Sequence, residues 1–159
     1  MTQMELDDLL GIFRALEQEG VEYVLVGGVA IGLRGIERAT NDVDLFIDPS
    51  QSNVLALKKA LRSVFDDPSI DEISADDLAG DYPTVRYGPP EGDFFVDIIG
   101  RLGSTVSFDD LESESMDVAG TRVNVATPRT LYRMKRDTVR PIDKIDAFNL
   151  RDKFSLEDE

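Results

Sequence analysis

Three aspartates lie where carboxylates are energetically costly, at or inside apolar strands. Asp42 and Asp44 flank the start of the predicted strand 43–48, and Asp97 interrupts the apolar segment 94–100. Side chains alternate across a strand, so Asp42 and Asp44 point to the same face. If the strand of Asp97 lies beside theirs, three carboxylates share one site. Repulsion between them raises at least one pKa unless a cation intervenes, so the pattern indicates a site for Mg²⁺ or Mn²⁺, which suit oxygen ligands.

A glycine pair, Gly27 and Gly28, ends the apolar segment 21–26 and precedes these aspartates by about a dozen residues. Backbone N–H groups at such a turn can approach phosphate oxygens without a side chain in the way, and a following helix favours the anion. The stretch lacks the G-x-G-x-x-G spacing and the Gly-Lys-Ser/Thr of a P-loop. A lone D-x-D, glycine pair or strand aspartate is usually structural, but their combination indicates a phosphate site beside a metal site.

The composition excludes several kinds of chemistry. The chain has no cysteine and no histidine, which excludes disulfides, zinc-thiolate sites, thiol nucleophiles and an imidazole base. Catalysis must use carboxylates, hydroxyls, lysine, arginine or a bound metal ion. No apolar segment approaches the roughly 18 residues that a membrane-spanning helix needs, so we expect a soluble, cytoplasmic protein with no membrane partner.

The charge is distributed unevenly along the chain. Residues 129–153 hold eight Lys or Arg against four Asp, a net charge of +4. Because the whole chain has a formal net charge of −15, the other residues together carry −19. A basic segment on an acidic body indicates a local anionic ligand, although any single charge can equally belong to a solvated helix face. The acidic remainder also predicts weak nonspecific binding of long nucleic acid.

Helices and strands that would position these residues alternate along the chain, which we predict to form one domain over residues 1–159. Hydrophobic spacing predicts a first helix that ends at Gly20, a strand over 21–26, a short helix around 29–34 and a helix from about residue 53. We expect residues 66–81 to form a loop with at most one helical turn. Two hairpins follow, and Thr127-Pro128 and Pro141 open a basic helical segment at about 128–154. The pattern favours a mixed α/β (α+β) domain with a mixed central sheet flanked by helices.

The order of an apolar strand, Gly-Gly, Asp-x-Asp and a later strand aspartate resembles the DNA polymerase β-type nucleotidyltransferase superfamily. Within it, "GGVAIGLRG" followed by "RATNDVDLFI" is most similar to the minimal bacterial AbiEii-like nucleotidyltransferases, some of which are toxin components of toxin-antitoxin pairs. The likeness is most specific over residues 21–48 and extends to Asp97. "LYRMKRDTVRPIDKIDAFNL" is similar to a lysine-containing segment and aspartate-bearing helix of that group.

The resemblance implies a metal-dependent transfer of a nucleoside monophosphate from an NTP to a hydroxyl group. Asp42, Asp44 and Asp97 would hold two metal ions, and Asp97 would also accept the proton. The resemblance extends to four positions of the C-terminal segment, namely Lys135, Arg140, Asp143 and Asp146. The candidate nucleotide ligands are Gly27 and Gly28 at the turn, Lys135 and Arg140 on the triphosphate, and Arg34 and Arg38 as lesser ones.

The sequence leaves the acceptor and two other classes of function open. The acceptor is an RNA end, a protein or a small molecule, and a cognate antitoxin or toxin protein is an implied partner. A non-catalytic nucleotide-binding or antitoxin-like module of the same fold is an alternative, but it has no need for three converging carboxylates. A metal-dependent phosphohydrolase is a third reading, which the absence of histidine disfavours.

Overall fold

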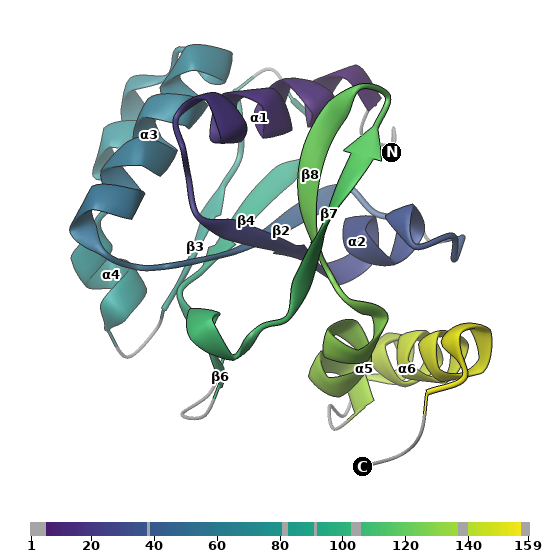
Figure 1. The fold of residues 1–159 in the computed structure, drawn as a ribbon. Coiled ribbons are helices and arrows are strands. Elements are labelled where there is room, and N and C mark those ends of the chain that lie inside the picture. The colour runs from purple at the N-terminus through teal and green to yellow at the C-terminus, as the bar shows by residue number, and fades with distance from the viewer. Residues whose placement is uncertain are drawn as a thin grey trace.

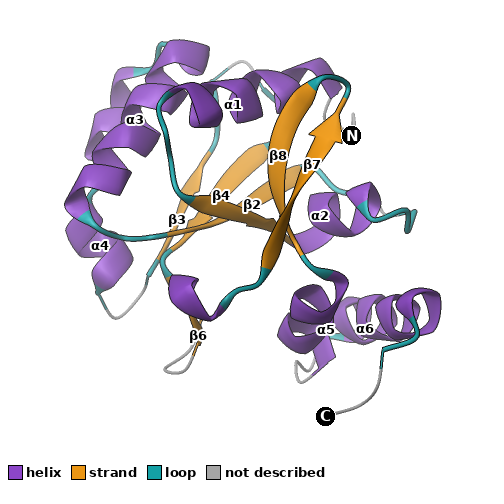
Figure 2. Cartoon of the chain, viewed as in Figure 1, coloured by secondary structure: helices purple, strands orange, loops and turns teal. Residues whose placement is uncertain are grey.

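The computed structural model describes residues 6–37, 39–80, 83–90, 92–102, 106–136 and 140–156. Within them, six strands form one mixed sheet at the centre of the molecule (Figures 1 and 2). Across the sheet, the order is β3 (Thr84–Tyr87), β4 (Phe95–Ile99), β2 (Asp42–Ile47), β1 (Tyr23–Val26), β8 (Thr121–Ala126) and β7 (Ser113–Val118). The pairs β2–β4 and β1–β8 are parallel, and the other neighbours are antiparallel. The predicted mixed α/β class is thus confirmed.

Two long helices, α1 (Leu6–Gln18) and α3 (Gln51–Phe65), lie side by side against the sheet (Figure 1). Their apolar faces join the alternate, inward side chains of the strands in one hydrophobic core. Ser50 caps α3 by accepting a hydrogen bond from the Asn53 backbone N–H. Asn53 itself is buried and donates to the carbonyls of Glu22 and Asp48, which fixes the start of α3 against the ends of β1 and β2.

Over residues 66–80, the described part of the segment 66–81, the chain forms two short helices, so the prediction of a loop with at most one helical turn is wrong. It contains a 3-10 helix, η1 (Pro68–Glu72), and a short α-helix, α4 (Ala75–Ala79). Asp67 and Ser74 cap these helices by accepting hydrogen bonds from backbone N–H groups of Ser69 and Asp77. One apolar side chain in each helix is fully buried, namely Ile70 and Leu78. A capping side chain and one buried apolar residue stabilise each of these short helices. Neither feature gives the repeating hydrophobic pattern from which a helix is predicted.

The two predicted hairpins are present as β3–β4 and β7–β8. The C-terminal helices α5 (Pro128–Arg136) and α6 (Pro141–Phe154) also form where Thr127-Pro128 and Pro141 predict them. They pack on each other, and α5 also contacts α2 (Gly27–Leu33), which begins directly after β1 (Figure 1). A small second sheet pairs β5 (Arg101–Leu102) with β6 (Val106–Ser107), and the 3-10 helix η2 (Phe108–Asp110) follows it.

Among the helices of the described residues, none combines the length and the apolar character that a membrane crossing requires.

Candidate active site

The sheet register brings the three predicted aspartates together on one face. In the parallel pair β2–β4, Asp44 lies opposite Asp97, and Asp42 is two residues before Asp44 on the same side of β2. The intervening Val43 and Val96 point the other way and are fully buried in the core. The alternation that places these valines in the core therefore directs the carboxylates to the opposite face.

An arginine that the sequence reasoning did not single out completes this cluster. Arg86 on β3 lies opposite Asp97 in the antiparallel register. Its Nε is 2.8 Å from Asp97 Oδ1 and its Nη2 is 3.0 Å from Asp97 Oδ2, a bidentate pair. The same Nη2 is 3.3 Å from Asp42 Oδ2, and the guanidinium carbon is 4.5 Å from the ring centroid of Phe95. One feature of the sequence could have identified Arg86, because it is the basic residue in the strand predicted to pair with the strand of Asp97.

Asp44 is the carboxyl group that the site perturbs most. Burial, followed by the negative charges of Asp97 and Asp42, raises the pKa of Asp44 to about 7. The protonated Asp44 carboxyl donates a hydrogen bond to Asp97, which favours the neutral form further. Lys135 acts in the opposite direction and lowers the pKa of Asp44. Near neutral pH the metal-free site therefore shares a proton, as expected for crowded carboxylates.

The glycine turn lies directly against Asp44. Val26, the last residue of β1, pairs with Asp44, and Gly27 follows it with φ of 75°. A Cβ atom at Gly27 would lie 2.8 Å from Asp44 Cγ, closer than real Cβ contacts come. A Cβ at Gly28 would lie 3.1 Å from the Cβ of Thr40. The turn therefore depends on glycine at Gly27 for both its backbone conformation and its contact with the acidic site.

We expect Gly27→Ala to lower the free energy of unfolding by about 1 to 3 kcal/mol, because alanine is strained at positive φ and its Cβ meets Asp44. Gly32→Ala in the same helix is the matched control, since a Cβ there has no atom within 4 Å. That control should be neutral or stabilising by roughly 0.5 to 1 kcal/mol. Urea unfolding of the two variants provides the comparison, and equal effects would contradict the steric argument.

A second charged cluster joins α5 to α6. Lys135 Nζ is 2.8 Å from Asp143 Oδ1 and 3.6 Å from Asp146 Oδ2, and both aspartates are buried. Arg140 is more exposed, with its Nε 3.8 Å from Asp143 Oδ2. The effect of Lys135 on the pKa of Asp44 places this cluster within electrostatic reach of the acidic site. All four C-terminal positions of the resemblance thus belong to one group of interacting charges.

Arg34, a predicted nucleotide ligand, makes contacts that join α2 to the β7–β8 hairpin. Its guanidinium donates to the carbonyl oxygens of Val125 and Ala126 and forms a 2.9 Å ion pair with Glu114. The side chain is only 11% exposed. These contacts give Arg34 a structural role. Arg38, the other arginine predicted there, lies outside the described residues.

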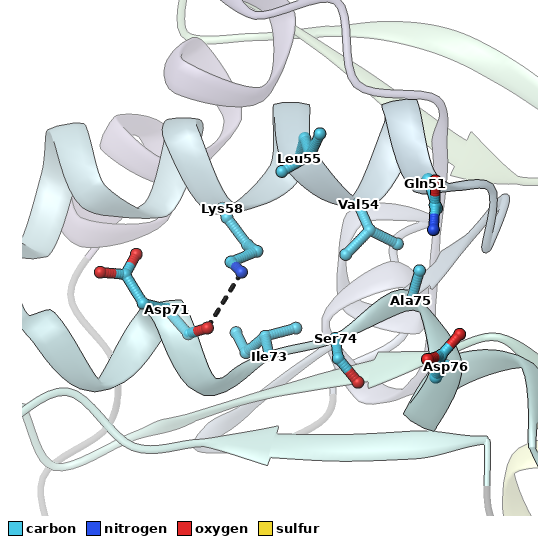
Figure 3. A pocket seen from close by; sticks show the side chains of 9 residues that line it. All are labelled: Gln51, Val54, Leu55, Lys58, Asp71, Ile73, Ser74, Ala75 and Asp76. Atoms are coloured by element: carbon cyan, nitrogen blue, oxygen red, sulfur yellow. Dashed lines mark hydrogen bonds between the residues drawn. The ribbon is translucent and has the colours of Figure 1, made fainter.

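An open depression of about 380 Å³ lies elsewhere on the molecule, between α3, η1 and α4 (Figure 3). Apolar side chains such as Val54 and Ile73 line it together with polar ones, and Lys58 Nζ donates to the backbone oxygen of Asp71 at 3.0 Å. None of the predicted site residues that the structure describes lines this depression.

Three aspartate side chains form a donor set of hard oxygen atoms, which suits Mg²⁺ or Mn²⁺. In the described part of the chain, however, no group of three acidic side chains is already arranged to hold a metal ion. Asp97 and Asp42 contact the guanidinium of Arg86 instead. The residues therefore fit a metal by chemistry, and Arg86 provides the positive charge in the present arrangement.

The fold is shared with solved structures of a nucleotidyltransferase-like protein and of nucleotide-transferring enzymes. A nucleotidyltransferase-like antigenic protein from Paracoccidioides brasiliensis superposes with a TM-score of 0.58 at 17% identity, over 96% of this chain and 79% of that one. The lincomycin-bound lincosamide adenylyltransferase LnuA superposes with a TM-score of 0.59 at 15% identity, over 94% of this chain and 98% of that one. ANT(2")-Ia in complex with adenylyl-2"-tobramycin superposes with a TM-score of 0.56 at 13% identity, over 96% of this chain and 91% of that one. At these identities the likeness establishes the fold.

The family follows from the sequence itself. Residues 9–144 match the model of the family described as "Nucleotidyl transferase AbiEii toxin, Type IV TA system", and the chain belongs to that family. The recognition of an AbiEii-like nucleotidyltransferase is thereby confirmed, and so is the assignment of the protein as an enzyme of this class. Among curated proteins, none matches the chain.

Proposed function

We propose that the protein transfers a nucleoside monophosphate from an NTP to a hydroxyl group and releases pyrophosphate, with Mg²⁺ or Mn²⁺ held by Asp42, Asp44 and Asp97. The observation that carries this proposal is the convergence of the three carboxylates on one sheet face, beside the turn at Gly27. Bound metal ions would polarise the triphosphate and lower the pKa of the acceptor hydroxyl, which is their usual role in such displacements.

The chain's own residues have distinct parts in this reaction. The absence of a side chain at Gly27 lets the Asp44 carboxylate lie directly against the turn. Backbone N–H groups of the turn would bind phosphate oxygens of the NTP. A carboxylate oxygen of Asp97, the residue between Asp44 and Arg86 in the sheet register, accepts the proton of the acceptor hydroxyl. Lys135 contributes positive charge near Asp44, and Arg140, whose side chain is 71% exposed and lies beside Asp143 in the same charged cluster, is the second proposed ligand of the triphosphate.

The biological role that we propose is that of the toxin in a toxin-antitoxin pair, with an antitoxin protein as its partner. This role rests on the description of the family. For the acceptor we keep three candidates, namely an RNA end, a protein hydroxyl and a small molecule. The ligands named for two structural neighbours, lincomycin and adenylyl-2"-tobramycin, are small hydroxyl-bearing molecules and favour a test of that class first.

The test incubates the protein with Mg²⁺ and each of the NTPs labelled at the α-phosphate, in a cell extract. We expect label to enter one class of acceptor, and a chelator should prevent the labelling. Asp42→Asn and Asp97→Asn should lose activity and keep the wild-type fold by circular dichroism. Asp76→Asn on α4, an exposed acidic position away from the site, is the matched control and should stay active. Full activity in Asp42→Asn or Asp97→Asn would contradict the proposal.

A further inference from the structure

Arg86 contacts two of the three carboxylates that the proposed metal site requires. Its guanidinium engages both oxygens of Asp97 and the Oδ2 atom of Asp42. We propose, on the basis of the proposed function, that Arg86 is a positioning residue that competes with the divalent metal. In the metal-free protein it holds Asp97 and Asp42 in place, and it must withdraw before the same carboxylates can bind the ion.

The competition follows from geometry and charge. Mg²⁺ lies about 2.0 to 2.1 Å from its oxygen ligands and demands near-ideal octahedral geometry. An ion at that distance from Asp97 and Asp42 would stand beside a guanidinium that contacts both residues at 2.8 to 3.3 Å. Two cations at such a separation repel each other, and the hydrogen bonds of the guanidinium already use a lone pair on both oxygens of Asp97 and on Asp42 Oδ2. The guanidinium and the metal therefore exclude each other.

Arg86 is also placed so that it can leave without disturbing the core. It belongs to β3, the outermost strand at its side of the sheet, and its side chain is 54% exposed. Its other contact is with the face of Phe95, which is itself 37% exposed. Rotation of the side chain into solvent would break only the contacts with Asp97, Asp42 and Phe95 among those described above, and it would leave the backbone pairing of β3 with β4 intact.

The alternative is that Arg86 only joins β3 to β4. In that case its removal would weaken the fold and leave the metal affinity unchanged. Metal binding in the absence of nucleotide separates the two roles, because it depends on the carboxylates and not on turnover.

The experiment measures Mn²⁺ binding to the full chain by isothermal titration calorimetry. We expect R86Q to bind Mn²⁺ about tenfold more tightly than the wild type, because the charge-assisted hydrogen bonds that oppose the metal are gone. R86K keeps the charge but loses the bidentate geometry and should fall between them. R122Q is the matched control, since Arg122 is 72% exposed and pairs with Glu17 on α1 instead of the site, and its affinity should equal that of the wild type.

A second measurement follows Arg86 itself. The side-chain Nε–Hε signal of Arg86, identified by its absence in R86K, should move toward the position of free arginine as Mg²⁺ saturates the protein. Equal Mn²⁺ affinity in R86Q and the wild type, or an unchanged Nε–Hε signal at saturation, would overturn the role of Arg86 and leave the metal site standing. Failure of both the wild type and R86Q to bind Mn²⁺ would overturn this proposal together with the metal site.

Discussion

Asp44→Asn is expected to abolish nucleotidyl transfer and to make the folded chain more stable at alkaline pH. The loss of activity follows because asparagine removes a charged oxygen from the proposed metal site without adding bulk. Stabilisation of transition-state charge by a bound metal is worth several kcal/mol, which corresponds to about a thousandfold in rate. Transfer of label from an NTP measures this effect, and activity within about tenfold of the wild type would contradict the role of Asp44.

The gain in stability follows from the raised pKa of Asp44. Its pKa is about 7 in the folded chain, mainly because of burial, against about 3.9 in an unfolded chain. The folded state therefore holds the proton more tightly. The resulting stabilisation is fully present below about pH 4 and is lost as the pH rises through about 7. Asparagine cannot ionise, and its amide can still donate to Asp97, so the variant does not undergo this loss.

Urea unfolding in metal-free buffer between about pH 5 and pH 8 tests the sign. The free energy of unfolding of Asp44→Asn minus that of the wild type should grow by about 3 kcal/mol across this range. Asp76→Asn, the exposed control on α4, should differ from the wild type by less than about 0.5 kcal/mol, as is usual for a surface substitution. A difference that stays constant for Asp44→Asn would show that the pKa of Asp44 is not raised in the folded chain.

The convergence of the aspartates could be predicted because it depends on two regularities. Alternation along β2 places Asp42 and Asp44 on one face whatever the neighbouring strand is. Asp97 joins them only if its strand lies beside β2, and the sequence alone does not determine which strand pairs with β2. In the structure β4 pairs with β2 in parallel, and Asp97 lies opposite Asp44. The glycine turn needed no such condition, since β1 ends immediately before Gly27.

Long-range side-chain contacts could not be predicted in the same way. Arg86 reaches Asp97 because of the register between β3 and β4, which a period of two residues does not specify. Arg34 is close to the glycine turn in sequence, yet its guanidinium binds the carbonyl of Ala126, a residue 92 positions away. The types of these residues were visible in the sequence, whereas their partners depended on the tertiary packing.

Asp143 and Asp146 lie between these cases. Their spacing of three residues places both on one face of α6, as helical geometry requires. That this face is buried, and that Lys135 of α5 meets it, follows from the packing of the two helices. Removing the ammonium group from two buried carboxylates is therefore energetically costly.

Lys135→Met is expected to lower the free energy of unfolding by about 3 to 5 kcal/mol, because it removes the ammonium group from two buried carboxylates. This is a large part of the roughly 5 to 15 kcal/mol that stabilises a typical domain. The control is Lys59→Met, since Lys59 is 76% exposed and its ion pair with Glu19 at 3.5 Å should contribute less than about 1 kcal/mol. Urea unfolding at neutral pH measures both variants.

A compensating set of substitutions shows whether charge burial is the cause. Adding Asp143→Asn and Asp146→Asn to Lys135→Met removes the two charges that the lost ammonium group had balanced. The triple variant should therefore recover much of the lost stability, because neutral amides of the same shape carry a far smaller desolvation penalty than carboxylates. If it is no more stable than Lys135→Met alone, or if Lys135→Met costs no more than Lys59→Met, the packing of the lysine side chain and not its charge joins α5 to α6.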